Sequence, residues 1–115
     1  MSYIKGDICT CIIPYEFGQN SKNRPVVFWD DWELSKDRPT VLVIPLTTVF
    51  AKQRYQPTFL IRKSFTDNLT KDSILTIYQF SCVSKNNISQ VIGRLSDTEI
   101  QAVTELLRRS FPSIY

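Results

Sequence analysis

The spacing of apolar residues changes once, near the carboxyl end, to a helical pattern. This change limits the possible folds more than any other feature. Ser96 and Glu99 form a capping-box pattern, in which the serine caps the first turn of a helix and the glutamate bonds back to it. Four apolar residues then recur at helical spacing: Ile100, Val103, Leu106 and Leu107. Phe111-Pro112 closes the segment. We therefore expect one amphipathic C-terminal helix.

Upstream of this helix, the chain consists of short β-forming runs separated by polar loops. The run from Thr40 to Leu46 is β-branched and apolar on both faces, which predicts a buried strand. Further strands are predicted over residues 8–14, 25–29, 58–61, 73–80 and 88–92. Five to seven short strands at this spacing favour a small barrel that one helix plugs or flanks. Without a visible repeat or linker, we expect a single domain over residues 1–115.

Composition excludes several classes of function. The chain has no histidine, so the commonest general acid/base, the imidazole metal ligand and any Ser-His or Cys-His pair are absent. Fourteen Lys and Arg against eleven Asp and Glu give a net charge of +3. This mild basic excess permits a nucleic-acid partner without demanding one. No carboxylate cluster is visible either, so we expect no metal and no cofactor.

The cysteines and the apolar runs indicate a protein of the cytoplasm. Three cysteines without a Cys-x-x-Cys pattern favour neither a disulfide framework nor a zinc ribbon. Cys9 and Cys11 share one face of a predicted strand and are expected to be buried, reduced thiols. The amino terminus has no signal-peptide pattern, and the longest apolar run, Val41 to Leu46, is too short to span a bilayer.

Two further residue pairs have structural interpretations. Trp29 and Trp32 flank two aspartates and are expected in the core or in a dimer interface. Arg108 and Arg109 fall in the last turn of the predicted helix, where cations complement the helix dipole. We favour this role over RNA contact for the arginine pair.

Six segments, in order along the chain, resemble those of the MazF/PemK toxins. They are Lys5-Gly6-Asp7-Ile8, residues 18–23, Arg24-Pro25-Val26-Val27, residues 41–48, residues 73–79 and Ile92-Gly93-Arg94-Leu95-Ser96. Dipeptides such as Arg-Pro and Gly-Arg are common, so the resemblance lies in the ordered set, which covers almost the whole chain. The resemblance implies a mainly β fold, a small SH3-like barrel of the MazF/CcdB type with an amphipathic C-terminal α-helix.

The same resemblance implies a function. Members of that family are toxins of type II toxin–antitoxin pairs that cleave single-stranded RNA at short sequences without a metal. The RNA's own 2′-hydroxyl is the nucleophile, and a 2′,3′-cyclic phosphate is left. The resemblance also implies a homodimer and a cognate antitoxin whose extended tail covers the active surface, with no membrane partner.

Arg24 and Thr47 are the candidate catalytic residues. Such an enzyme must align the 2′-hydroxyl and stabilise the charge of the transition state. A guanidinium holds two phosphate oxygens at once, and the resemblance gives the matching arginine an acid/base role as well; its high pKa makes charge stabilisation the better-founded role. Thr47 directly follows the buried strand, and Thr48 replaces it if the register shifts by one residue. The alternatives are an arginine paired with Asp30 or Asp31 and a threonine chosen for β-propensity.

Eight side chains are candidate RNA contacts. Aromatic rings stack on splayed bases, amides read base edges and cations follow phosphates. The set is Phe17, Gln19, Asn20, Lys22, Thr48, Lys52, Arg54 and Gln79. For the cations the alternative is ordinary solubility of a loop, for Phe17 it is packing back on the barrel, and for Gln79 an amide facing water.

The sequence departs from the family at two places, which keeps other functions open. Many relatives carry an acidic residue in the first loop, where Gln19, Asn20 and Ser21 stand, and a basic residue at the position of Ser81. These departures predict an altered sequence preference or lost catalysis. The runner-up is therefore a non-nucleolytic toxin or protein-binding module of the gyrase-poison type, since one fold hosts several functions. A third reading is a catalytically inactive homologue kept for antitoxin binding.

Overall fold

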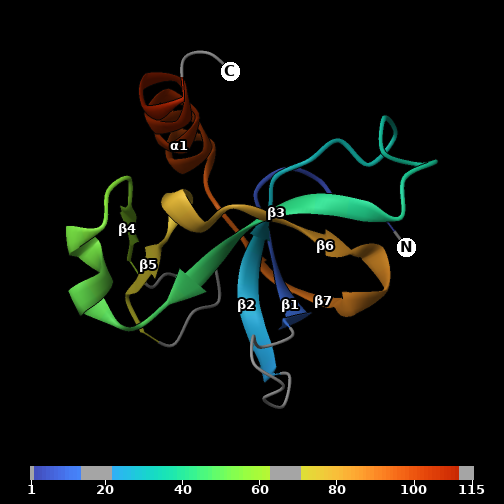
Figure 1. Ribbon diagram of the computed structural model, residues 1–115, viewed down its shortest axis with the longest axis horizontal. Helices are drawn as coiled ribbons and strands as arrows, with labels where there is room; N and C mark the ends of the chain where they lie inside the picture. The colour runs from blue at the N-terminus through green and yellow to red at the C-terminus, as the bar shows by residue number, and fades with distance from the viewer. Residues whose placement is uncertain (1, 14–21, 63–70, 112–115) are drawn as a thin grey trace.

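The computed structural model describes residues 2–13, 22–62 and 71–111, and within these the side chains of Ile13 and Lys22 are not described. Figure 1 shows the arrangement of the strands and the helix. The strands are β1 (Asp7–Ile13), β2 (Lys22–Phe28), β3 (Thr40–Thr47), β4 (Phe59–Ile61), β5 (Ser73–Leu75), β6 (Ser81–Ser84) and β7 (Ile88–Arg94). The helix is α1 (Asp97–Ser110), and short 3-10 helices are η2 (Phe50–Arg54), η3 (Ile77–Gln79) and η4 (Lys85–Asn87).

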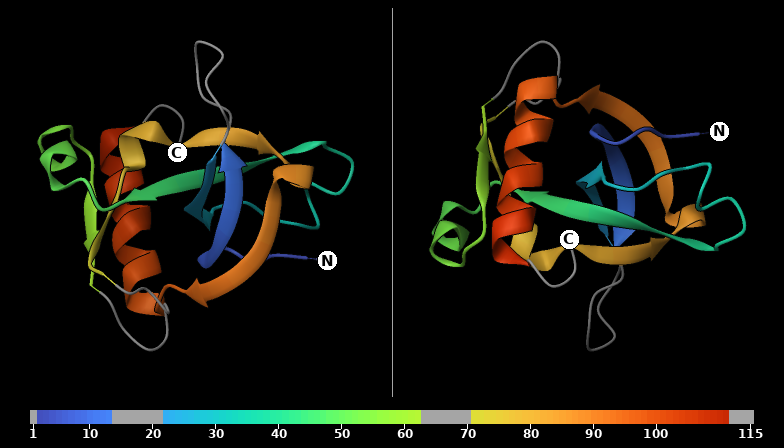
Figure 2. Two further views of the ribbon diagram at one scale, coloured as in Figure 1. Left: turned by 90° about the horizontal axis from the view of Figure 1, so that it is seen from below. Right: turned by 90° about the horizontal axis from the view of Figure 1, so that it is seen from above.

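The strands form one curled, antiparallel sheet in the order β4-β5-β3-β2-β1-β7, with β6 paired to β3. Figure 2 shows the sheet curving into a half-barrel, with α1 lying to one side of it near β4 and β5. One edge of β3 pairs with β2, and its other edge pairs first with β6 and then with β5. The predicted mainly β, barrel-like fold with a C-terminal helix is confirmed.

The larger hydrophobic core lies between the sheet and α1. Val27, Ile44 and Leu75 of the strands pack with Val103 and Leu107 of the helix in one buried cluster. The helical spacing of the apolar residues placed these two helix side chains on the face that meets the sheet. Burial of this shared apolar surface is what fixes α1 against the half-barrel.

A second core contains the residues on the other face of β1. Cys9 and Cys11 are fully buried there, and all three cysteines of the chain are free, which confirms the prediction of buried, unpaired thiols for this pair. Trp32 is half-buried and packs against the same cluster, with its ring 5.3 Å from that of Tyr3. Trp29 belongs to the first core. Of the two places predicted for the tryptophans, the core and a dimer interface, the structure shows the core for both.

The helix begins as its capping box predicts. The Ser96 hydroxyl accepts from the Glu99 amide at 3.1 Å, and the Glu99 carboxylate accepts from the Ser96 amide at 2.9 Å. Arg108 and Arg109 lie in the last turn, where Arg108 contacts Glu105 at 3.5 Å. No helix among the described residues is both long and apolar enough to cross a membrane.

Gly6 brings the start of β1 against the start of α1. Its φ is +96°, and a Cβ at this position would lie 2.6 Å from the Ile100 Cδ1 atom. The Gly6 amide donates to the Phe28 carbonyl, and the Gly6 carbonyl accepts from the Leu95 amide, both at 2.9 Å. A side chain here would require both a rare backbone conformation and a shift of the Ile100 side chain.

Three predicted boundaries need correction. The strand predicted to start at Pro25 begins at Lys22, because the β1–β2 hairpin continues to the Ile13–Lys22 pair. The strand predicted over 73–80 ends at Leu75, where the Thr76 amide and hydroxyl both donate to the Pro45 carbonyl and the chain turns into η3. The loop predicted over 47–56 contains η2.

One strand was missed altogether. β6 (Ser81–Ser84) pairs with the first half of β3. Its sequence, Ser-Cys-Val-Ser, lacks the apolar alternation that identifies a half-buried strand. The strand exists because β3 offers it an open edge.

Candidate active site

Arg24 and Thr47 come from neighbouring strands and lie opposite each other. In the antiparallel β2–β3 ladder, Val26 pairs with Pro45. Continuing that register by two residues places Arg24 opposite Thr47, and residues directly opposite in an antiparallel pair project to the same face. The ladder begins one residue after Pro25, which has no N–H to contribute.

These two residues line one shallow pocket of about 200 Å³. The residues that line it are Arg24, Pro25, Leu46, Thr47, Thr48, Val49 and Ser73. The structure thus brings together both predicted catalytic residues and one predicted RNA contact, Thr48. Among the described residues, the lining contains a cation and three hydroxyl groups but no carboxylate, a composition that suits an anionic group such as a phosphate.

The Thr47 hydroxyl is oriented by the turn that follows it. Its Oγ1 accepts a hydrogen bond from the Val49 amide at 3.1 Å. A hydroxyl has one proton to donate and two lone pairs, so accepting this bond leaves the O–H available to a ligand. Thr47 is half-buried whereas Thr48 is exposed, which makes Thr47 the better-positioned donor of the two.

Ser73 is a pocket residue that the sequence reasoning missed. It is the first residue of β5 and is only 5% exposed, although it lines the pocket. Its hydroxyl donates to the Lys71 carbonyl at 3.3 Å. The available signal was its place at the head of the Ser-apolar-Gln segment, which gave no reason to separate it from an ordinary strand-initial serine.

The predicted cations Lys52 and Arg54 do not line the pocket. Both lie in η2, which follows Thr47 after a short turn. The Arg54 guanidinium donates to the Tyr55 hydroxyl at 2.7 Å and stacks 4.9 Å from the Tyr55 ring. Because the two side chains hold each other, Arg54 presents its charge from a defined position beside an exposed ring.

The remaining predicted contacts are not part of this pocket. Gln79 ends η3 and is exposed, but it does not line the pocket. Phe17, Gln19 and Asn20 lie outside the described residues, and for Lys22 the structure places the backbone in β2 but describes no side chain. Their roles stay predictions.

The segment that carries Thr47 is free of acidic residues. No Asp or Glu occurs between Asp37 and Asp67, whereas five Lys and Arg do. The sequence reasoning counted charge over the whole chain and overlooked this local excess. Within the described ranges, no group of three or more His, Cys, Asp or Glu side chains is placed to hold a metal ion.

Comparison with known protein families identifies the chain. The family model of PemK-like, MazF-like toxins of type II toxin-antitoxin systems matches residues 4–111. The chain belongs to this toxin family. No curated protein sequence matches the toxin.

Two solved structures resemble the toxin. The Mycobacterium tuberculosis toxin MazF-mt6 gives a TM-score of 0.70 at 17% identity, covering 92% of this chain and 96% of its own. An endoribonuclease in complex with its cognate antitoxin, from a mycobacterial species, gives a TM-score of 0.65 at 13% identity, covering 96% of this chain and 93% of its own. At these identities the likeness establishes the fold of the toxin.

Proposed function

We propose that the toxin is a sequence-selective, metal-independent endoribonuclease that cleaves single-stranded RNA. The observation that carries this proposal is the convergence of Arg24 and Thr47 on one pocket whose described lining adds two further hydroxyl groups, those of Thr48 and Ser73. Membership of the MazF/PemK toxin family supports it, as does the likeness to a structure described as an endoribonuclease.

The chemistry requires little from the protein. The 2′-hydroxyl of the RNA attacks the adjacent phosphorus, the bond to the 5′-oxygen of the next nucleotide breaks, and a 2′,3′-cyclic phosphate and a 5′-hydroxyl result. Arg24 stabilises the charge that develops on the phosphate oxygens, and Thr47 donates a hydrogen bond to one of them. DNA lacks the nucleophile and is therefore not a substrate.

The proposed partners follow from the same family. We infer a cytoplasmic homodimer and a cognate antitoxin that masks the RNA-binding face, because one structural relative is described in complex with its antitoxin. Lys52 and Arg54, in η2 beside the pocket, are proposed to hold the phosphates that flank the cleaved bond, and Gln79 to contact a base.

The deciding experiment is cleavage of a long single-stranded RNA by the purified toxin in EDTA. Arg24→Ala is compared with Arg108→Ala, a control that removes an exposed arginine from α1. We expect fragments ending in a 2′,3′-cyclic phosphate, a loss of about 10²-fold or more in kcat with Arg24→Ala, and an unchanged rate for the control. A 2′-deoxy substrate should remain intact. Intact RNA throughout, with the protein folded, would reject the enzyme and favour a protein-binding toxin on the same barrel.

A further inference from the structure

A second pocket lies at the opposite end of β2 and β3 from the candidate active site. It measures about 580 Å³ and is lined by residues 2–5, residues 29–33 and Leu42. Asp30 is six residues beyond Arg24, which is roughly 20 Å along an extended strand. The two pockets are therefore separate surfaces of the molecule.

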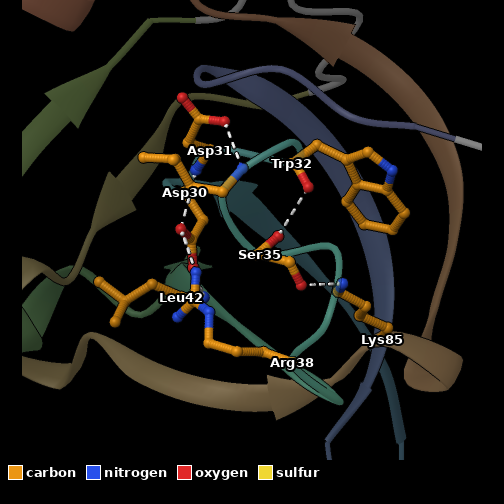
Figure 3. Close-up of polar contacts among 8 residues, drawn as sticks. Asp30, Asp31, Trp32, Ser35, Arg38, Leu42 and Lys85 are labelled. Atoms are coloured by element: carbon orange, nitrogen blue, oxygen red, sulfur yellow. Dashed lines mark hydrogen bonds and ion pairs between the residues drawn. The ribbon is translucent and has the colours of Figure 1, made fainter.

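The loop over residues 30–39 forms one wall of this pocket and is held by its own hydrogen bonds (Figure 3). The Asp30 carboxylate accepts from the amides of Asp31 and Leu42 and from the Arg38 guanidinium, at 2.8, 2.9 and 2.9 Å. The Ser35 hydroxyl donates to the Trp32 carbonyl, and Lys85 reaches from η4 to the Ser35 carbonyl. A loop fixed in this way loses little conformational entropy when a partner binds.

The charge of this wall is opposite to that of the chain. The loop carries four carboxylates against Lys36 and Arg38, in a chain whose net charge is +3. Asp31 and Glu33 line the pocket, are exposed and form no ion pair within the described residues. Of the described residues that line the pocket, Lys5 is the one cation, and its ammonium lies 5.3 Å from the centre of the Trp29 ring. The described lining therefore carries three carboxylates against one ammonium group, a balance that disfavours a polyanion such as RNA.

Apolar side chains stand beside these carboxylates. Leu34 is 82% exposed and Ile4 58% exposed, two of the most exposed large hydrophobic residues in the described chain. Ile4 lines the pocket together with Tyr3, Trp32 and Leu42, and Leu34 directly follows the lining residue Glu33. An ordered loop that presents a leucine to solvent next to carboxylates without an ion pair in the described chain has the composition of a binding surface.

We infer that this face docks a segment of a protein partner that carries Lys or Arg next to an apolar side chain. The cation meets Asp31 and Glu33, and the apolar side chain meets Leu34 and the pocket. Charge complementarity selects this occupant over nucleic acid. Because the site lies away from Arg24 and Thr47, the inference is independent of whether the toxin cleaves RNA.

The test is direct binding of a fluorescent peptide of alternating Leu and Arg, measured by anisotropy. Matched peptides of Leu and Glu and of Ser and Arg separate the two components. The variant D31N/E33Q keeps an acceptor for the Leu34 amide, which Asp31 now bonds at 3.0 Å, and L34S removes the apolar group. The control D97N/E105Q removes the same number of charges from α1.

We expect saturable binding of the Leu-Arg peptide alone, weakened about tenfold or more by D31N/E33Q and about fivefold or more by L34S, and unaltered in the control. RNA cleavage by these variants should equal that of the unmodified toxin. Absence of saturation up to about 1 mM peptide, or equal weakening in the control, overturns the inference. So does sedimentation showing that L34S alone abolishes self-association, because the occupant would then be a second copy of the chain.

Discussion

Thr47 and Thr48 are neighbours in the sequence, and both line the candidate active site. They differ in what holds them. The Thr47 hydroxyl accepts from the Val49 amide, and its residue ends a paired strand, so its oxygen is held in position while its proton remains available to a ligand. Thr48 lies just beyond the strand and is exposed. The geometry therefore assigns the proposed phosphate contact to one of two chemically identical side chains.

Replacing each threonine separately tests this assignment. We expect Thr47→Ala to lower kcat on RNA by about 10²-fold, since one positioned donor to a developing anion is lost, and Thr47→Ser to retain most of the rate. Thr48→Ala should remain within a few-fold of the unmodified toxin. Single-turnover cleavage of a short RNA measures the chemical step, and equal losses for the two alanine variants would contradict the assignment.

We expect the three cysteines to differ in reactivity because they differ in burial. Burial, helped by the nearby Asp7 carboxylate and the Cys11 thiol, raises the pKa of Cys9 to about 12, and burial also raises the pKa of Cys11. Cys82 is exposed on β6.

Thiol labelling should reflect this difference, because the thiolate is the reacting form. At about pH 8 we expect the native toxin to react at Cys82 only, and the denatured toxin at all three cysteines. Mass spectrometry after labelling counts the modified sites. Rapid modification of Cys9 in the native protein would show that the first strand opens readily.

At the scale of elements, the loop over residues 30–39 is organised by one partly buried carboxylate, that of Asp30. Burial raises the pKa of Asp30, but hydrogen bonds from the Leu42 and Asp31 amides and the Arg38 guanidinium outweigh it, and the net shift is downward. The charged form is therefore favoured by folding.

The sign of the pH dependence follows from this shift. Because the folded pKa lies below the unfolded one, the contribution of Asp30 to stability is present above about pH 4 and is lost as the pH falls through the folded value. We expect Asp30→Asn to lower the free energy of unfolding by about 1–3 kcal/mol at pH 7 and by less in acid. Urea unfolding between pH 7 and pH 3 measures the difference; a constant difference would contradict it.

Sequence reasoning succeeded where one local pattern determined an element and failed where a distant partner did. The Ser96 capping box and the apolar run of β3 were read correctly, since both are local signals. β6 was missed because the open edge of β3, not its own residues, makes it a strand. The strand predicted over 73–80 was wrong beyond Leu75, because Thr76 donates a hydrogen bond to the Pro45 carbonyl and the chain turns there. Ser73 lines the pocket because β5 pairs with β3, and this long-range pairing cannot be read from the local sequence.

At the scale of the whole molecule, the larger hydrophobic core is closed by one helix packed against the curled sheet. Leu107 fixes α1 to the sheet from inside the larger core, at 4% exposure. Leu34, in the loop over residues 30–39, is also a leucine, but its side chain is exposed to solvent. The two leucines are therefore a matched pair for measuring what the helix–sheet contact contributes.

Truncating these two leucines should give very different results. We expect Leu107→Ala to lower the free energy of unfolding by about 2–5 kcal/mol, through lost burial and the cavity it leaves. Leu34→Ala should change it by less than about 0.5 kcal/mol. Denaturant midpoints at constant m-value make the comparison, and similar losses at both sites would mean that the loop, like the helix, is part of the cooperative core.

Because β3 pairs with β2, β6 and β5, the order in which these strands are synthesised sets the order in which the sheet can form. The hairpin that sets Arg24 opposite Thr47 is synthesised early, whereas β5 and β6 emerge later and must pair with the remaining edge of β3. Ser73 reaches the pocket only with β5, and α1 covers the core last. Since a nascent chain folds from its amino end, the pocket is complete only when most of the polypeptide has left the exit tunnel. The candidate pocket is therefore completed only after β5 has been synthesised and has paired with β3.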